Sequence, residues 1–174
     1  MTGPYPVPPP PGYGYGYAPP GGPAAPPWAG GGRAVNPAGI AVSLVGGALV
    51  LLAAFLPWYS AGDNDTVLAD IVRALDVDGA KAFPKAYFGW LIWVVLAGCV
   101  VAALFANLPG RASGALRVAA PVLGAAGALC VVLALDDLIR QGSVFDNSGA
   151  GLYLTLIGFL VAGAGGVLGP RRTR

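Results

Sequence analysis

Four long apolar runs constrain this chain more than any other feature of its sequence. They cover residues 38–56, 88–108, 118–135 and 149–168, and none of them contains a charged side chain. Each run has 18 to 21 residues, which as an α-helix matches the roughly 30 Å hydrocarbon core of a bilayer. The runs are apolar on every side, whereas a helix of a soluble bundle carries a polar stripe. The sequence therefore predicts an all-α membrane protein, a bundle of four transmembrane helices.

The same runs divide the chain into regions. We expect helices over about residues 38–59, 88–108, 117–138 and 149–169, within a transmembrane domain at 37–169. In front of it, residues 1–36 are mostly Pro, Gly, Ala and Tyr, with Arg33 as the one charged side chain. Such a composition buries too little apolar surface to offset the entropy cost of ordering, so it predicts a disordered tail. Residues 170–174 form a short basic end.

The distribution of charge between the runs predicts the orientation in the membrane. One set of connections and ends holds only basic residues: Arg33, Arg111, Arg117, Arg171, Arg172 and Arg174. The two other loops hold four basic residues and all 8 acidic ones, every one an aspartate. Because basic loops stay in the cytoplasm, we expect a plasma-membrane protein with both termini inside and the two acidic loops outside.

Aromatic residues gather where the first two helices are expected to meet the outer headgroups. Trp58 and Tyr59 follow the first run, and Tyr87, Trp90 and Trp93 open the second. A ring with a polar tip is well placed at a membrane interface, so these residues are candidate anchors. Alternatively, they form an outer-face docking surface for a partner or a lipid.

The first external loop, residues 60–86, contains the stretch "TVLADIVRAL". Its spacing places apolar side chains on one helical face and Asp70 and Arg73 on the other, and Asp65 or Thr66 could cap the helix. This pattern predicts a short amphipathic helix, which either lies on the membrane surface or folds over the end of the bundle. The apolar positions are Val67, Leu68, Ile71, Val72 and Leu75.

Few side chains in this sequence could act in catalysis or bind a metal. The chain has no His and no Glu, so the commonest general base is absent, and no nucleophile–base pair, metal cluster or phosphate-binding loop can be assembled. We therefore expect neither an enzyme nor a cofactor or metal. Asp136 and Asp137 directly follow the third run. They either end that helix, with Asp136 paired to Arg140, or form a proton or cation site.

Small residues recur at a spacing of four within the runs. This spacing lets lipid-embedded helices approach closely, so it predicts tight packing within a compact bundle. The candidate packing residues are Gly39, Ser43, Gly47, Gly98, Gly124, Gly158, Ala162 and Gly166.

Three segments, "PPPPGYGYGYAPP", "FLPWYS" and "GLYLTLIGFLVAGAGGVLGPRRTR", give the chain the layout of a known group. It resembles the small conserved membrane proteins of actinobacteria, mycobacteria especially. This resemblance implies a plasma-membrane location and, as for some proteins of this kind, a role as accessory subunit of a respiratory or cell-envelope complex.

The leading hypothesis is therefore a non-enzymatic accessory or scaffolding subunit. Its expected partners are other integral membrane proteins, lipids and a cytoplasmic component at the tail. Nucleic acid is excluded, because the tail carries a single positive charge. The alternative is a small transporter or lipid-binding protein that uses the outer aspartates and aromatics. A transporter usually places its substrate-binding groups near the bilayer midplane. The polar groups deep in the runs are limited to Ser43 and Thr155, which argues against a transporter.

Overall fold

The computed structural model of this chain describes residues 33–61, 64–76, 80–138, 145 and 147–172. Every described residue belongs to one compact unit, Gly31–Arg174, which is mostly helical. The predicted disordered tail lies outside the described residues up to position 32, and so does Arg140.

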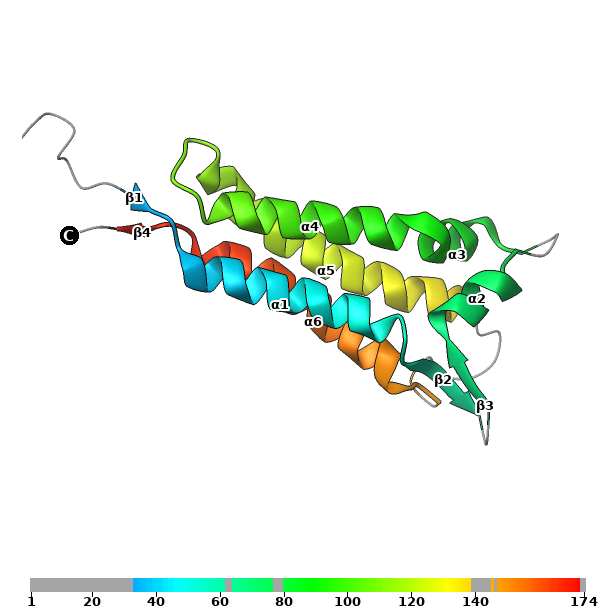
Figure 1. Cartoon of the computed structure of the whole chain (residues 1–174). Coiled ribbons are helices and arrows are strands. Elements are labelled where there is room, and N and C mark those ends of the chain that lie inside the picture. The colour runs from blue at the N-terminus through cyan, green and yellow to red at the C-terminus, as the bar shows by residue number, and fades with distance from the viewer. Residues whose placement is uncertain (1–32, 62–63, 77–79, 139–144, 146, 173–174) are drawn as a thin grey trace, which may run out of the picture. The chain divides into compact units, whose positions relative to one another are not determined.

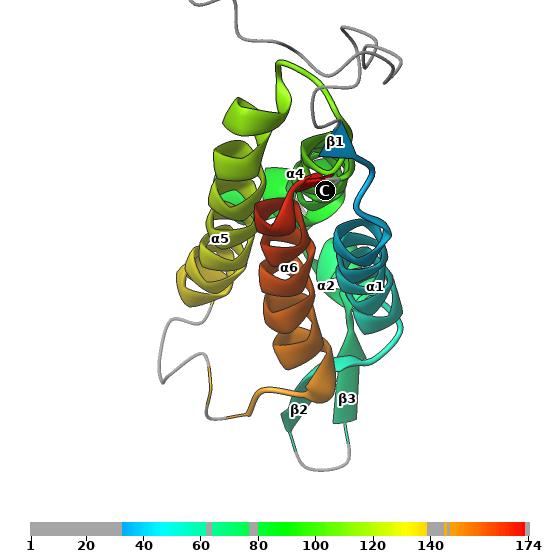
Figure 2. The same cartoon turned by 90° about the vertical axis from the view of Figure 1, so that its left-hand side faces the viewer.

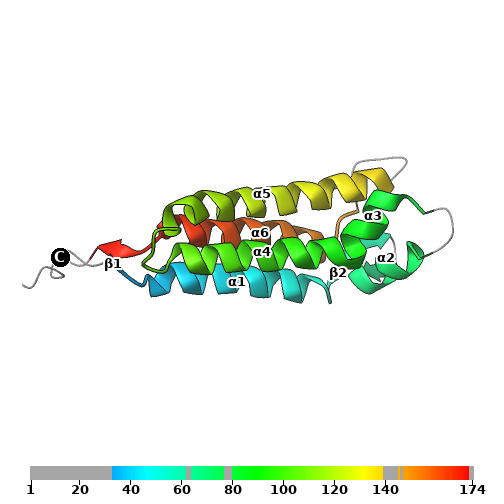
Figure 3. The same cartoon turned by 90° about the horizontal axis from the view of Figure 1, so that it is seen from above.

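Four helices of this unit lie side by side: α1 (Pro37–Ala53), α4 (Ile92–Ala106), α5 (Ser113–Leu138) and α6 (Ala150–Leu168) (Figure 1). Helix α6 packs against α1, α4 and α5, and Figure 2 shows it between α1 and α5. Helix α4 contacts α5 and α1, as the view in Figure 3 illustrates. Helix α6 is therefore the central helix of the bundle.

Among the described residues, three helices are long and apolar enough to cross a membrane: Ala82–Ala106, Ser113–Leu138 and Ala150–Leu168. The first consists of α3 (Ala82–Ala86), the π-helical turn η1 (Tyr87–Leu91) and α4. Only 33%, 33% and 50% of their most apolar windows are buried inside the chain, so most of this apolar surface faces outward. Helix α1 is a shorter apolar helix of 17 residues.

Helix α1 ends at Ala53, so the predicted end near residue 59 is wrong. The indole N–H of Trp58 donates a 2.7 Å hydrogen bond to the carbonyl oxygen of Ala53, and the main-chain N–H groups of Phe55 and Leu56 close tighter turns on Leu52 and Ala53. These bonds satisfy carbonyl groups that a continuing helix would otherwise have paired. Ala54, Phe55 and Leu56 are apolar and do not mark this turn, but Pro57 was an available signal, because the residue before a proline disfavours the helical conformation.

Each end of the bundle carries a small sheet. At one end, β2 (Pro57–Ala61) pairs antiparallel with β3 (Asn64–Val67), and the chain continues into α2 (Leu68–Ala74). The segment before α6 joins this hairpin, because the N–H of Ser60 bonds the carbonyl oxygen of Asn147 at 2.9 Å. We call this the capped end. At the other end, the basic end, β1 (Arg33–Ala34) pairs antiparallel with β4 (Arg171–Arg172) (Figure 1).

Small residues let α1 and α6 approach backbone to backbone. A Cβ at Gly46 would overlap the backbone of Ala162, and one at Gly158 would lie 2.7 Å from Val50 Cγ2 and 2.8 Å from the carbonyl oxygen of Gly46. Ser43 is fully buried, and its hydroxyl donates to the carbonyl oxygen of Gly39 at 2.9 Å. Gly46 thus contributes to this contact, although the spacing of small residues predicts its neighbour Gly47.

The remaining candidate packing residues lie in different settings. A Cβ at Gly124 would approach the carbonyl oxygen of Phe159 to 2.5 Å, and one at Gly166 would approach Ala120 Cβ to 2.5 Å. Gly39 faces the side chain of Asn107, and a Cβ at Gly47 would lie 3.2 Å from Val100 Cγ2. Gly98 differs, because it is exposed and its Cβ would come no nearer than 4.0 Å to Leu123 Cδ1.

Candidate functional site

The aromatic residues of the capped end divide between the core and the surface. Trp58 is 2% exposed and its ring meets that of Phe88 edge to face, at 5.8 Å between centroids. Tyr87 is fully buried and its hydroxyl donates to the carbonyl oxygen of Gly127 at 2.8 Å. Trp58 and Tyr87 therefore do not form part of a docking surface, because the chain itself uses both their rings and their polar tips.

Two tryptophans remain on the surface. Trp90 is 59% exposed and Trp93 is 36% exposed, and both follow the π-helical turn or lie in it. Tyr59 is half-buried, and its hydroxyl accepts a 3.1 Å hydrogen bond from the side-chain amide of Asn147. Of the five predicted interface residues, Trp90 and Trp93 are thus the ones most available to a partner or a lipid.

Helix α2 folds over the end of the bundle. Leu68, Ile71 and Leu75 are buried in the same apolar cluster as Tyr87 and Phe88. The structure therefore favours the second of the two arrangements considered for the predicted amphipathic helix. Its apolar face stabilises the capped end instead of lying on a separate surface.

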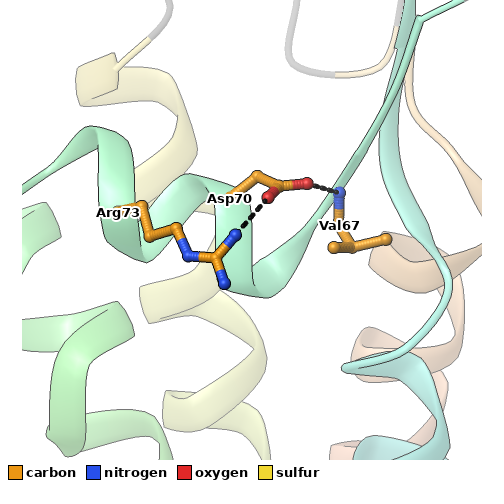
Figure 4. A network of polar contacts seen from close by, with 3 residues as sticks. All are labelled: Val67, Asp70 and Arg73. Carbon is orange, nitrogen blue, oxygen red and sulfur yellow. Dashed lines mark hydrogen bonds and ion pairs between the residues drawn. The ribbon is translucent and has the colours of Figure 1, made fainter.

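The first turn of α2 is fixed by Asp70. Its carboxylate accepts from the N–H of Val67 at 3.4 Å and from the guanidinium of Arg73 at 3.4 Å (Figure 4). An acidic side chain in the first turn also interacts favourably with the helix dipole. The predicted caps are wrong, since Val67 stands at the N-cap, and Asp65 accepts a 2.7 Å bond from the hydroxyl of Ser60.

Three neighbouring hollows that share lining residues lie along the outside of α1, α4 and α2, and together we call them the lateral groove. Its first part, about 400 Å³, lies between α1 and α4 and is lined by apolar residues. Trp93 also lines the second part, about 520 Å³, which α2 and the end of α1 border. Val72, Arg73 and Gly89 are shared between this part and the third, about 670 Å³, which reaches α3. The groove therefore connects apolar helix surface to the charged residues of the capped end.

The third part of the groove, its mouth, carries both signs of charge. It is lined by Arg73, Asp76 and Lys85. Lys85 forms an ion pair of 3.1 Å with Asp76, and Arg73 forms one of 3.4 Å with Asp70. Arg73 is 81% exposed and Lys85 is 51% exposed, so both cations can reach a ligand from solution.

The structure separates the two aspartates at the end of α5. Asp137 pairs with Lys81, whose ammonium also bonds the main-chain carbonyl oxygen of Asp137. Asp136 is exposed. Within the described ranges, no group of three or more acidic or cysteine side chains is arranged to hold a metal ion. A proton or cation role for Asp136 and Asp137 remains a prediction.

Sequence reasoning missed a buried polar node at the basic end, formed by Asn36, Asn107 and Arg117. The Asn107 amide donates to the carbonyl oxygens of Ala103 and Gly165 at 2.8 and 2.9 Å, and the main-chain N–H of Asn36 bonds the carbonyl oxygen of Asn107 at 3.2 Å. These bonds tie the ends of α1, α4 and α6 together. The available signals were Asn36, just before the first apolar run, and Asn107, at the end of the second.

Arg117 and Gly169 complete this node. Gly169 has φ +58°, a backbone conformation that favours glycine, and its carbonyl oxygen accepts from the Asn36 amide at 2.8 Å. The guanidinium of Arg117 occupies the place where a side chain at Gly169 would start. Asn36 Oδ1, Asn107 Oδ1 and Arg117 Nε are buried without a hydrogen-bond partner in the part of the chain that the structure describes.

No known protein family, no curated protein and no solved structure matches this chain. The candidate site is the lateral groove with its charged mouth, because it joins exposed aromatic, apolar and charged side chains.

Proposed function

We propose that this chain is a non-enzymatic integral membrane protein of four spans, an accessory or scaffolding subunit of a larger plasma-membrane assembly. The observation that carries the proposal is the outward direction of its apolar surface. Half or more of the most apolar window in each of the three long helices is not buried inside the chain. Such a surface is stable only against lipid or against other membrane-embedded helices.

The interior of the bundle supports a non-enzymatic role. Its buried polar side chains serve the backbone: Ser43 and Thr155 donate to carbonyl oxygens four residues earlier, at 2.9 and 2.8 Å. Asn107 bonds main-chain carbonyl groups in the same way. These groups stabilise helix ends and contacts, and a hydroxyl already committed to a helix carbonyl is a poor nucleophile without a base beside it.

The charges at the two ends of the bundle support an orientation with both termini in the cytoplasm. The β1–β4 pair places the backbones of Arg33 and Arg172 opposite each other, at the end where Arg117 lies against Gly169. Asp70, Asp76 and Asp137 belong to the capped end, around α2 and α3. This separation of charge is the one that the positive-inside rule associates with a cytoplasmic basic end.

Copurification tests the proposed function. The full chain, tagged at its C-terminus and expressed in its native host, is extracted with a mild detergent, and the proteins that accompany it are identified by mass spectrometry. We expect an integral membrane protein in stoichiometric amount. Recovery of the chain alone, or only with copies of itself, would contradict a role as accessory subunit.

A truncated variant shows which part of the chain contacts the partner protein. Residues 1–32 are removed and residues 33–174 retained, because Asn36 bonds Gly169 and Arg33 belongs to β1. If the tail recruits the partner, the variant loses it while its extraction and yield stay unchanged. If the transmembrane domain makes the contact, both forms recover the same membrane protein.

A further inference from the structure

The part of the lateral groove between α1 and α4 exists because small residues face each other there. Gly47 and Ala48 on α1 lie opposite Ala97 on α4, between walls that include Leu51 and Trp93. The lining is entirely apolar, so water gains nothing by occupying it. In the membrane placement proposed above, this trough opens sideways to the bilayer, where the available apolar ligand of matching shape is an acyl chain.

Two further hollows extend the groove toward the mouth. Gly89, in the π-helical turn, lines both upper parts of the groove, and a Cβ placed on it would meet no atom within 4 Å. Its missing side chain therefore leaves the floor open between Trp93 and the charged residues. π-helical turns occur frequently at functional sites, and this one aims Tyr87 inward and leaves Gly89 exposed.

The charges at the mouth are balanced. Two cations, Arg73 and Lys85, have two carboxylates, Asp70 and Asp76, as partners at 3.4 and 3.1 Å. Exposed ion pairs of this kind contribute little to stability, so a ligand can exchange for either partner. A purely anionic ligand would meet both carboxylates as well as both cations, whereas a zwitterionic ligand finds a group of opposite sign for each of its charges.

We propose that the lateral groove binds one zwitterionic phospholipid of the phosphatidylethanolamine type. An acyl chain lies between α1 and α4, the phosphate contacts Arg73 and Lys85, and the amine contacts Asp76. Guanidinium and ammonium groups are the usual protein ligands of phosphate. The exposed Trp90 and Trp93 lie along the same path, as expected of aromatic residues near the headgroups. The proposal depends on the membrane placement above and not on the accessory role.

Lipid titration tests this proposal. The full chain, delipidated in detergent, is titrated with 1-palmitoyl-2-oleoyl-phosphatidylethanolamine, and bound lipid is counted by native mass spectrometry. We expect one tight-binding lipid. Gly89→Trp should fill the floor of the groove and lower the affinity at least tenfold. Gly114→Trp is the matched control, since a Cβ there also meets no atom within 4 Å, but it lies on α5 and away from the groove lining.

A second blocking variant and a charge variant keep the test decisive. Ala97→Trp blocks the lower part of the groove and should give the same loss if Gly89→Trp folds poorly. Arg73→Gln should weaken phosphatidylethanolamine about tenfold but leave the binding of dioleoylglycerol, which has no phosphate, unchanged. Circular dichroism and gel filtration check that each variant is folded.

Three results would overturn the proposal. Equal lipid binding by the parent and both blocking variants would show that the lipid lies elsewhere. If Arg73→Gln bound phosphatidylethanolamine and dioleoylglycerol with equally reduced affinity, Arg73 would not contact the phosphate. Occupation of the groove by a partner's helix or by residues 1–32, detected by photo-crosslinking from position 97, would replace the lipid with protein. None of these results decides the accessory role, which copurification tests separately.

Discussion

The hydroxyl of Tyr87 donates a 2.8 Å hydrogen bond to the main-chain carbonyl oxygen of Gly127, 40 residues further along the chain. Tyr87 stands at the start of η1, and Gly127 lies in the middle of α5. The same ring meets Phe88 edge to face, with centroids 5.4 Å apart. This bond fixes the long helix Ala82–Ala106 against α5, and it explains why a tyrosine at an expected membrane interface is buried.

Removing this hydroxyl should destabilise the fold modestly. Tyr87→Phe keeps the ring contacts and loses one buried hydrogen bond, which contributes about 1 kcal/mol. We expect the free energy of unfolding, measured by sodium dodecyl sulfate titration of the protein in mixed micelles, to fall by that amount. Tyr59→Phe is the control, because the hydroxyl of Tyr59 bonds an exposed partner, Asn147. An equal loss in both variants would contradict the special role of the buried bond.

Two glycine substitutions should have opposite effects. Gly158→Ala introduces a Cβ 2.7 Å from Val50 Cγ2 and 2.8 Å from a main-chain oxygen, so it should separate α1 from α6 and cost about 1–3 kcal/mol. Gly98→Ala meets nothing nearer than 4.0 Å, and alanine has the higher helix propensity, so it should be neutral or stabilise by up to about 1 kcal/mol. Thermal unfolding of both variants in the same detergent compares them directly, and equal melting temperatures would show that the α1–α6 contact is not tight.

Two substitutions of Asn107 should show that burying a charge in the polar node costs more stability than losing an amide donor. Asn107→Leu introduces no charge, but it removes the amide donor from the buried carbonyl oxygens of Ala103 and Gly165, so we expect a cost of about 1–3 kcal/mol. Asn107→Asp keeps the shape but places a carboxylate against the carbonyl oxygens of Ala103 and Gly165, at a cost of about 3 kcal/mol or more at neutral pH. The two unfolding free energies, measured side by side, check this order. A smaller loss for the aspartate would mean that water or the Arg117 guanidinium compensates the carboxylate.

Labelling of single cysteines tests the orientation. Asn64 and Ala112 are exposed positions at opposite ends of the bundle, and each is changed to cysteine in a Cys99→Ala, Cys130→Ala background. We expect an impermeant maleimide to label position 64 on intact cells and position 112 only after lysis. The reverse pattern would place the basic end outside.

The end of α5 offers a test of the proton or cation hypothesis. Asp137→Asn keeps one contact of Lys81, the bond to the main-chain carbonyl oxygen, and the pair is partly exposed, so its loss should cost less than about 1 kcal/mol. We therefore expect Asp137→Asn and Asp136→Asn to reach parental abundance. Ion or proton flux into vesicles that contain each variant then checks the role. Equal flux in the parent and both variants would end the hypothesis.

Much of the helical framework could be predicted from the apolar runs. Helix α6 spans Ala150–Leu168, close to the expected 149–169, and α5 ends at Leu138 as expected. Helix α5 begins at Ser113, earlier than expected, because the Ser113 hydroxyl bonds the carbonyl oxygen of Gly110 at 2.8 Å and stabilises the turn before it. Helix α1 ends earlier than predicted, because the composition after Ala53 stays apolar while the backbone turns.

The residues that line the lateral groove could be predicted in part, but their assembly into one site could not. Trp90 and Trp93 were expected near the outer headgroups, and the loop helix with Arg73 was expected on that side. Their assembly into one groove depends on the fold of α2 over the bundle and on the open position at Gly89. Neither is visible in a pattern of single residues, since both depend on which elements lie next to each other.

The sequence by itself determined the apolar helices and the separation of acidic from basic connections, because these follow from local periodicity and from the cost of charge in hydrocarbon. The tertiary structure decided which aromatics are core and which are surface. Trp58 and Tyr87 find carbonyl acceptors at Ala53 and Gly127, whereas Trp90 and Trp93 remain exposed. All four have an apolar ring and a polar tip, so only the position of an acceptor in space distinguishes them.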